Sequence, residues 1–277
     1  MKIFLIASLI GVVGIGAAAG SSAPARQSTA TGGVPMANFT SNCRFSHSSN
    51  DDPIMHPNMP GMSHNHSFFG NVSTNAFSTL ASLRRAGTSC HRHGDRAAYW
   101  APTLVNPHGK LIRPLSASVY YIRSTLKPTH AFPAGLRMIA GNMRATTPQR
   151  YIAWSCGPVS GRTPSRSVPT CPSRADTGLQ LTVTFPDCWN GRDLDSADHK
   201  SHMTYAIRGL CPSSHPVTVP SMSLTIRYSV TGGPAYHLAS GGPYSGHADF
   251  VNSWNQQELV RLVRECLNAD RECGSHH

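Results

Sequence analysis

Short apolar stretches with a period of two dominate the hydrophobic pattern of this chain. The stretches 118–123, 179–185 and 223–230 are rich in β-branched and aromatic residues, and Pro or Gly lies near their ends. Residues 101–115 and 137–154 carry weaker versions of the same pattern. The chain also contains 24 Gly and 21 Pro, which favour turn-rich connections. We therefore predict a mainly β fold, an antiparallel sandwich or jelly-roll with long loops and one C-terminal helix.

Helical periodicity is clearest near the C-terminus. Ser253 is placed to cap this helix and Gln256 stands at the third helical position, which predicts a capping box. Residues 76–86 are the candidate for a second, short helix. The C-terminal helix carries an apolar stripe that we expect to pack into the core. The stripe consists of Leu259, Val260, Leu262, Val263 and Leu267.

The start of the chain has the pattern of an export signal. Lys2 supplies a positive charge, residues 3–16 are apolar and uncharged, and the alanines at 17–19 offer a small-residue cleavage site. The apolar run is short for a bilayer, which disfavours the alternative of an uncleaved anchor, and we expect no membrane span after signal removal. The predicted organisation is a signal peptide at 1–19, a flexible leader at 20–37 and a single secreted β-rich domain at 38–277.

Eight cysteines follow this segment, and an even number in an exported chain argues for a disulfide-stapled domain. The chain has no Cys-x-x-Cys pair, which weakens a cysteine zinc site. The sequence alone leaves the connectivity open, and near neighbours in sequence are the first pairs to test. These are Cys156 with Cys171, Cys188 with Cys211, and Cys266 with Cys273, which would leave Cys43 with Cys90.

The charge balance points to anionic partners. The chain has 24 Lys and Arg against 13 Asp and Glu, a formal net charge of +11. Such a chain is attracted to acidic polysaccharide, anionic wall polymer, membrane surface or nucleic acid. The basic residues are scattered, however, and no nucleic-acid-binding motif is present. A solvated, arginine-rich surface therefore stays open as the alternative to a dedicated anion site.

Histidine and aspartate gather in three segments that are far apart in the sequence, at 51–70, 185–202 and 247–254. The three glutamates all lie in the C-terminal helix region, so carboxylate chemistry elsewhere depends on aspartate. Imidazole and carboxylate suit proton transfer near neutral pH, and they equally suit a divalent metal. We predict that at least two of the segments converge on one site. The candidate catalytic residues are His64, His66, Asp198, His199, His202, His247 and Asp249.

The spacing of four histidines makes them candidate metal ligands. His64 and His66 are two positions apart, so an extended chain points both side chains to the same side. His199 and His202 are three apart, which is a ligand spacing on a helical turn. The alternative is a structural role for each histidine in hydrogen bonds of its own. The cofactor that this spacing favours is a divalent metal.

Aromatic residues stand beside these segments and are candidates for stacking on sugar rings. Trp100 lies two positions before Pro102, and Trp189 directly follows Cys188. For these two residues a role in the core is favoured instead. The candidate substrate-binding residues are Tyr99, Trp100, Trp189 and Trp254.

The same residues carry a family resemblance. The elements are Asp-Pro-Ile, Ser-His-Asn-His-x-Phe-x-Gly, Tyr-Trp-x-Pro, Phe-Pro-x-Cys-Trp-Asn-Gly, Asp-His-x-x-His and His-x-Asp-Phe, in this order. The chain resembles, over about residues 39–268, the secreted fungal and bacterial family known as the domain of unknown function DUF1996. The resemblance implies export and a carbohydrate setting, because members are often joined to carbohydrate-binding modules such as WSC domains. By matching positions, it also implies a site at the seven candidate catalytic residues.

We therefore predict a secreted carbohydrate-active protein, a glycoside hydrolase or a polysaccharide lyase, whose partner is a polysaccharide that carries negative charge. Hydrolysis would use two aspartates, for which Asp198 and Asp249 are the candidates. Elimination from an acidic sugar would use a histidine as the base, with Arg or a metal holding the charge. Two alternatives remain, a non-catalytic polysaccharide-binding domain and an extracytoplasmic copper or zinc protein.

Overall fold

The computed structural model describes Met1 and residues 37–157, 165–173, 178–242 and 244–274. The expected signal peptide at 1–19, apart from Met1, and the leader at 20–37, apart from Ala37, lie outside the described residues. Within the part of the chain that is described, no helix is both long enough and apolar enough to span a membrane.

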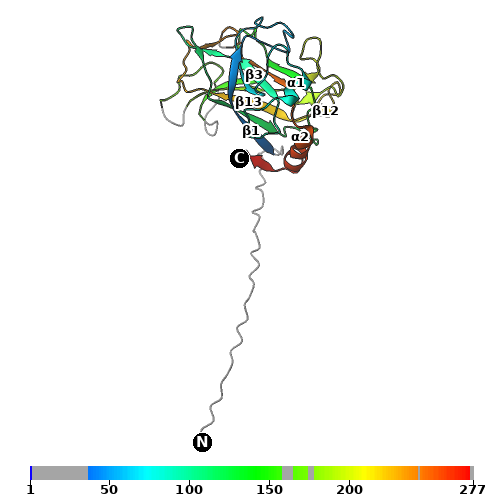
Figure 1. Ribbon diagram of the computed structural model, residues 1–277. Helices are drawn as coiled ribbons and strands as arrows, with labels where there is room; N and C mark the ends of the chain where they lie inside the picture. Colours follow the sequence, from blue (N-terminus) through cyan, green and yellow to red (C-terminus); the bar gives the residue numbers. More distant parts are fainter. Residues whose placement is uncertain (2–36, 158–164, 174–177, 243, 275–277) are drawn as a thin grey trace.

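One large sheet organises the fold, and its strands pair antiparallel except at the C-terminal strand β16 (Glu272–Gly274), which pairs parallel with the first strand. Figure 1 shows these two ends of the domain side by side. The order across the sheet is β7 (Arg137–Gly141), β15 (His247–Val251), β3 (Ala98–Pro102), β2 (His66–Gly70), β1 (Asn38–Ser49), β6 (Ser116–Ile122), β13 (Ser221–Arg227), β9 (Leu179–Thr184) and β8 (Ile152–Cys156).

The long strand β1 joins the two halves of this sheet. Its first half pairs with β6 and its second half pairs with β2, and the register shifts between Phe45 and His47. The halves pack face to face around one core. In that core the rings of Phe185 and Phe250, from opposite halves, have centroids 6.3 Å apart. The predicted antiparallel, sandwich-like β fold is confirmed.

The predicted strands lie where the alternating pattern placed them. The stretches 118–123, 179–185 and 223–230 fall largely in β6, β9 and β13. The two weaker regions contain or border β3, β7 and β8 and the short strands β4 (Leu104–Val105) and β5 (Leu111–Ile112). β4 and β5 form a small sheet with β14 (His237–Leu238). A second small sheet consists of β10 (Cys188–Trp189), β11 (Met203–Thr204) and β12 (Val217–Thr218).

The C-terminal helix is present as α2 (Gln256–Leu262), which continues as the π-helical turn η1 (Val263–Leu267). The predicted cap at Ser253 is wrong. The side chain of Asn255 caps the helix by accepting from the Glu258 amide, while the Ser253 hydroxyl donates to the Arg96 carbonyl. The helix starts later because Trp254 is held in the core, with its amide bound by the side chain of Asn252.

The apolar stripe of this helix packs into the core as predicted, except at one position. Val260 is 45% exposed, because it lies one residue, or about 100° of helical rotation, past the buried Leu259. The second predicted helix is also present as α1 (Leu80–Arg85), and Thr79 and Ser82 form its capping box.

All four disulfides pair near neighbours in the chain, as the first pairing to test predicted. Cys266–Cys273 links η1 to β16, and Cys43–Cys90 links β1 to the loop before β3. The other two are Cys156–Cys171 and Cys188–Cys211. Four disulfides are typical of proteins that fold in an oxidising compartment.

Strands β2, β3 and β15 are buried on both faces. Their inner face contributes Phe69, Tyr99 and Phe250 to the main core. Their outer face carries a second apolar cluster that includes Phe68 and Trp100 and is covered by residues of the 50–65 loop and of α1. Any polar side chain on this outer face is therefore removed from water as well.

The main core encloses a polar network around Asp95. The Tyr99 hydroxyl donates to the Asp95 carboxylate at 2.9 Å and lies 2.5 Å from the Tyr121 hydroxyl. The Trp254 indole donates to the same Tyr121 oxygen at 2.9 Å. Burial raises the pKa of Asp95 to about 7, so the carboxyl group keeps its proton more readily in the folded state.

This shift predicts a pH dependence of stability. Between pH 4 and 7 the unfolded chain loses the Asp95 proton while the folded chain keeps it, so the free energy of unfolding falls as pH rises. The loss should reach about 4 kcal/mol, at about 1.4 kcal/mol for each pKa unit. Denaturant unfolding of the parent and of Asp95→Asn at pH 4 to 8 measures it. The difference in stability between the two proteins should change across this range, and a constant difference would contradict the prediction.

Candidate functional site

Three histidine rings meet on the outer face of the sheet. His66 lies on β2, His247 lies on β15, and His64 lies in the loop just before β2. The ring centroids are 4.3 Å apart for His64 and His66, 5.1 Å for His64 and His247, and 5.8 Å for His66 and His247. One ring nitrogen from each lies within 4.8 Å of the other two. The first and third segments singled out from the sequence thus come together.

Strand alternation explains why these side chains share a face. In β15, His247 and Asp249 alternate with Ala248 and Phe250, which belong to the main core. The neighbouring strand β7 approaches this part of β15 very closely at Gly141, which has a φ of +86°. A Cβ at Gly141 would lie 2.9 Å from the Cα of His247 and 2.5 Å from the Gly246 carbonyl oxygen, so only glycine fits there.

Backbone contacts orient two of the rings. The Nδ1 of His66 lies 3.1 Å from the Asp51 carbonyl oxygen, and the Nδ1 of His247 lies 2.9 Å from the Ser245 carbonyl oxygen. Because a carbonyl only accepts, each Nδ1 carries the proton and each Nε2 presents a lone pair. A hydrogen bond from Nδ1 to a carbonyl oxygen is also the arrangement that orients histidine ligands in metal sites.

The environment keeps all three imidazoles neutral. Burial, reinforced by His56, lowers the pKa of His64 to about 4. Burial lowers the pKa of His247 to about 3, and it lowers that of His66 well below its usual value, with His64 and His247 adding to the effect. Neutral imidazole is the form that binds a metal ion.

Two buried carboxyl groups border the rings. Asp52, His66 and Asp249 form a second group whose ligand atoms lie within 4.8 Å of one another. Asp52 Oδ1 accepts from the Ile54 and Met55 amides, at 2.9 Å each. Burial raises the pKa of Asp249 well above its usual value, and the nearby Asp52 adds to the rise. A cation between Asp52 and Asp249 would lower the pKa of Asp249 again, because the positive charge favours the carboxylate form.

Several atoms at this point are buried without a hydrogen-bond partner. They are the Nε2 atoms of His64 and His66 and both carboxyl oxygens of Asp249. An unpaired buried polar atom is costly, so such a concentration points to a ligand that would satisfy them together. Nitrogens that share a tetrahedral ion lie about 3.4 Å apart, so small ring rotations would bring the three histidines onto one ion. The residues therefore fit a transition metal bound by imidazole and carboxylate.

The centre opens into a cavity of about 430 Å³. His64, His247 and Asp249 form part of its wall, and His56, Arg144 and Lys200 line it as well. Lys200 donates a hydrogen bond to the Gly141 carbonyl, and burial lowers the pKa of its ammonium group. The cavity thus combines candidate metal ligands with basic groups, a combination suited to a substrate with negative charge.

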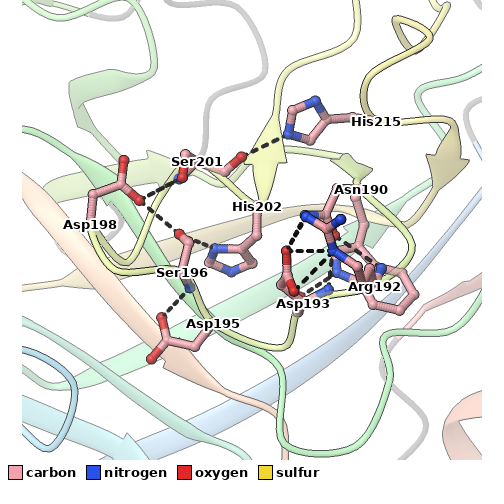
Figure 2. Close-up of polar contacts among 10 residues, drawn as sticks. Asn190, Arg192, Asp193, Asp195, Ser196, Asp198, Ser201, His202 and His215 are labelled. Atoms are coloured by element: carbon pink, nitrogen blue, oxygen red, sulfur yellow. Dashed lines mark hydrogen bonds and ion pairs between the residues drawn. The ribbon is translucent and has the colours of Figure 1, made fainter.

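Residues 190–202 of the second segment form a loop with a network of polar contacts (Figure 2). None of these residues belongs to the three-histidine group. The Ser196 hydroxyl donates to Asp198 at 2.7 Å and lies 2.8 Å from His202 Nδ1. His202 Nε2 lies 2.7 Å from the Arg137 carbonyl oxygen, and His199 Nδ1 lies 2.9 Å from Asp195. His199 and His202 therefore lie in a non-helical turn, each with partners of its own.

Asp198 lines the cavity, unlike the two histidines that follow it. Its Oδ1 accepts from the amides of Lys200 and Ser201, and these bonds with the Ser196 and Ser201 hydroxyls hold the pKa of Asp198 well below its usual value. Asp198 and Asp249 thus share one cavity with their pKa values shifted in opposite directions.

The candidate aromatic residues lie mostly inside the protein. Tyr99 and Trp254 are buried in the main core, and Trp100 is buried on the outer face, where it stacks on Phe68. Trp189 is half-buried, and its indole nitrogen donates to the Asp193 carbonyl. None of these four rings lines the cavity beside the three histidines.

Asp52, His56 and Lys200 also lie at this site, although they were not among the candidates from the sequence. Asp52 begins the Asp-Pro-Ile element and Lys200 follows Asp198-His199, so both were adjacent to residues already chosen. Nothing in the sequence around Arg144 and Gly141 indicated a role at the site. Their place in the cavity depends on how β7 packs against β15.

One comparison with known proteins identifies the family. A family model described as a domain of unknown function (DUF1996) matches residues 52–254, which is most of the chain and includes the whole three-histidine centre. The chain belongs to this family. No curated protein and no solved structure matches the chain.

The contrast between satisfied and unsatisfied polar groups predicts opposite effects on stability. His202→Ala should lower the free energy of unfolding by about 2 kcal/mol, because it removes two buried hydrogen-bonded contacts. Asp249→Leu, measured in protein treated with a chelator, should leave stability unchanged or raise it, because it removes an unpartnered buried carboxyl group. Urea unfolding of the two variants beside the parent measures both effects. A marked loss of stability in Asp249→Leu would contradict this account of the site.

Proposed function

We propose that this member of the DUF1996 family is an extracytoplasmic metalloprotein, in which His64, His66 and His247 hold a divalent transition-metal ion that acts on a carbohydrate polymer. One observation carries the proposal: a ring nitrogen from each of His64, His66 and His247 lies within 4.8 Å of the other two, and the Nε2 atoms of His64 and His66 are buried without a partner. A cation would satisfy these nitrogens, and the buried carboxyl groups of Asp52 and Asp249, which form a group with His66, would balance its charge.

The charge of the protein supports a polymer with carboxylate groups. The chain has a net charge of +11, and Arg144 and Lys200 line the cavity beside the proposed metal. These side chains suit recognition of an acidic sugar such as a uronic acid. The carbohydrate setting itself is supported by the resemblance described from the sequence, and the four disulfides support an oxidising, extracytoplasmic location.

The favoured reaction is elimination. A bound divalent ion would neutralise the carboxylate of the sugar and so make the adjacent carbon more acidic. A proton acceptor that lines the cavity, His56, would remove that proton, while the glycosidic oxygen leaves with the bonding electrons and takes a proton from solvent water. The products are a new chain end and an unsaturated sugar.

A second candidate is hydrolysis without a metal. Asp198 and Asp249 share the cavity, and two carboxyl groups with pKa values shifted apart suit the roles of base and acid. This reaction would add reducing ends without an unsaturated product, and it would survive removal of metal.

Metal binding is the first test. Protein loaded with Zn(II) and then dialysed should retain about one equivalent of zinc, since the three histidines form one group of candidate ligands. His64→Ala and His247→Ala should each weaken Zn(II) binding more than about 100-fold, because loss of a ligand costs more than loss of its outer-shell partner. His199→Ala is the matched control and should bind zinc like the parent, since His199 pairs with Asp195 instead.

Retention of less than about a tenth of an equivalent by the parent protein would rule out the metal centre. Equal zinc binding by the parent and by His247→Ala would place the ion elsewhere in the protein.

The reaction is tested on a panel of neutral and acidic polysaccharides. Elimination predicts ultraviolet-absorbing products from an acidic polymer, abolished by a chelator and restored by metal, because the ion holds the sugar carboxylate. Lys200→Met should lower the rate at least about tenfold, since a positioned charge-stabilising group contributes about 10²-fold or more. Reducing ends that form equally with and without the chelator would favour the Asp198 and Asp249 hydrolysis. Retention of polymer without cleavage by metal-loaded protein would indicate a binding domain.

A further inference from the structure

Exposed methionines concentrate around the three-histidine centre. Within residues 37–274, as far as the structure describes them, Met138, Met203 and Met222 are buried in the core, which is the ordinary place for this side chain. The exposed methionines of the same residues all lie on two segments, the 50–65 loop and the turn after β7. They are Met55, Met59, Met62 and Met143, with exposed fractions of 44%, 47%, 57% and 40%.

Three of these thioethers line one cavity. Met55 and Met62 come from the loop that also carries His64, and Met143 comes from the turn after β7, two residues after Gly141. The same cavity is lined by His64, whose Nε2 is buried without a partner. Soft sulfur donors and an available imidazole nitrogen therefore surround one opening.

We propose that Met55, Met62 and Met143, together with His64, bind a copper(I) ion in this cavity. Thioether sulfur is a soft ligand that favours Cu(I) over Zn(II) and over the hard divalent ions. The inference rests on the proposed function for its context. The inner set of imidazoles and carboxylates suits Cu(II), so the two neighbouring ligand sets suit the two common oxidation states of one element.

The alternative reading is that the methionines form an apolar surface for a substrate. Two observations favour the metal. The loop that bears Met55 and Met62 also bears the candidate ligands His64 and His66, within 12 positions of sequence (55–66). The cavity wall also carries Asp198, whose hydrogen bonds favour the charged carboxylate form, and this negative charge suits a cation. Leucine keeps the apolar surface of methionine and removes its sulfur, so this substitution separates the two readings.

The test uses the full-length exported protein, the triple variant Met55→Leu/Met62→Leu/Met143→Leu and the control Met59→Leu, which changes an exposed methionine of the same loop that does not line the cavity. Cu(I) affinity is measured under anaerobic conditions by competition with the chromophoric chelator bicinchoninate. The triple variant should bind Cu(I) at least about tenfold more weakly than the parent, and Met59→Leu should match the parent. X-ray absorption of the Cu(I)-loaded parent should show sulfur neighbours of copper that the triple variant lacks.

Zn(II) binding, measured on the same proteins, keeps the two proposals apart. Unchanged Zn(II) binding by the triple variant with weakened Cu(I) binding supports both. Equal Cu(I) affinity of the parent and the triple variant, or a copper spectrum with nitrogen and oxygen neighbours alone, overturns the methionine site and leaves the three-histidine centre standing. Absence of Zn(II) and Cu(II) binding by the parent, with Cu(I) still bound through sulfur, overturns the centre and leaves the methionine site.

Discussion

Burial of β2, β3 and β15 on both faces is the constraint on which the rest of this structure depends. The inner face of these strands must pack against β6 and β13, and it does so with large aromatic side chains such as Tyr99 and Phe250. The outer face must be covered as well, and the 50–65 loop provides much of that cover. Strand alternation then places His66, His247 and Asp249 on this covered face, and His247 and Asp249 form part of the cavity wall.

The protein treats buried polar groups in two opposite ways. In the main core, Asp95 is surrounded by donors from Tyr99 and the peptide backbone, so the network is satisfied and rigid. On the outer face, backbone carbonyls fix the orientation of His66 and His247 but leave the other ring nitrogen free to act as a ligand. The Nδ1 atoms of these rings are held by hydrogen bonds, while other buried polar atoms of the site have no partner. Such a site is organised for a ligand rather than for stability, because the unpartnered atoms cost folding free energy.

His66 links the two ligand groups, because it belongs both to the three-histidine group and to the group with Asp52 and Asp249. His66, His247 and Asp249 on the strands are at most 4% exposed, whereas the methionines of the cavity wall, Met55, Met62 and Met143, are 40–57% exposed. Hard and borderline ligands thus lie deep in the protein, where charge must be balanced, and soft thioether groups lie nearer to solvent.

The sequence by itself determined where the main strands and the two helices lie, because these depend on local periodicity, and it offered the disulfide pairs, such as Cys266 with Cys273, only as the first ones to test. It also singled out His64, His66, His247 and Asp249 as polar residues in extended segments. Only the tertiary structure decided that the first and third segments meet and that His199 and His202 are bound within their own loop, because spacing in sequence does not show which face a loop presents. It likewise decided that Tyr99, Trp100 and Trp254 are buried and that Lys200 and Met143 reach the site. These facts follow from contacts between strands that are distant in the chain, and such contacts form only when the sheet closes around its core.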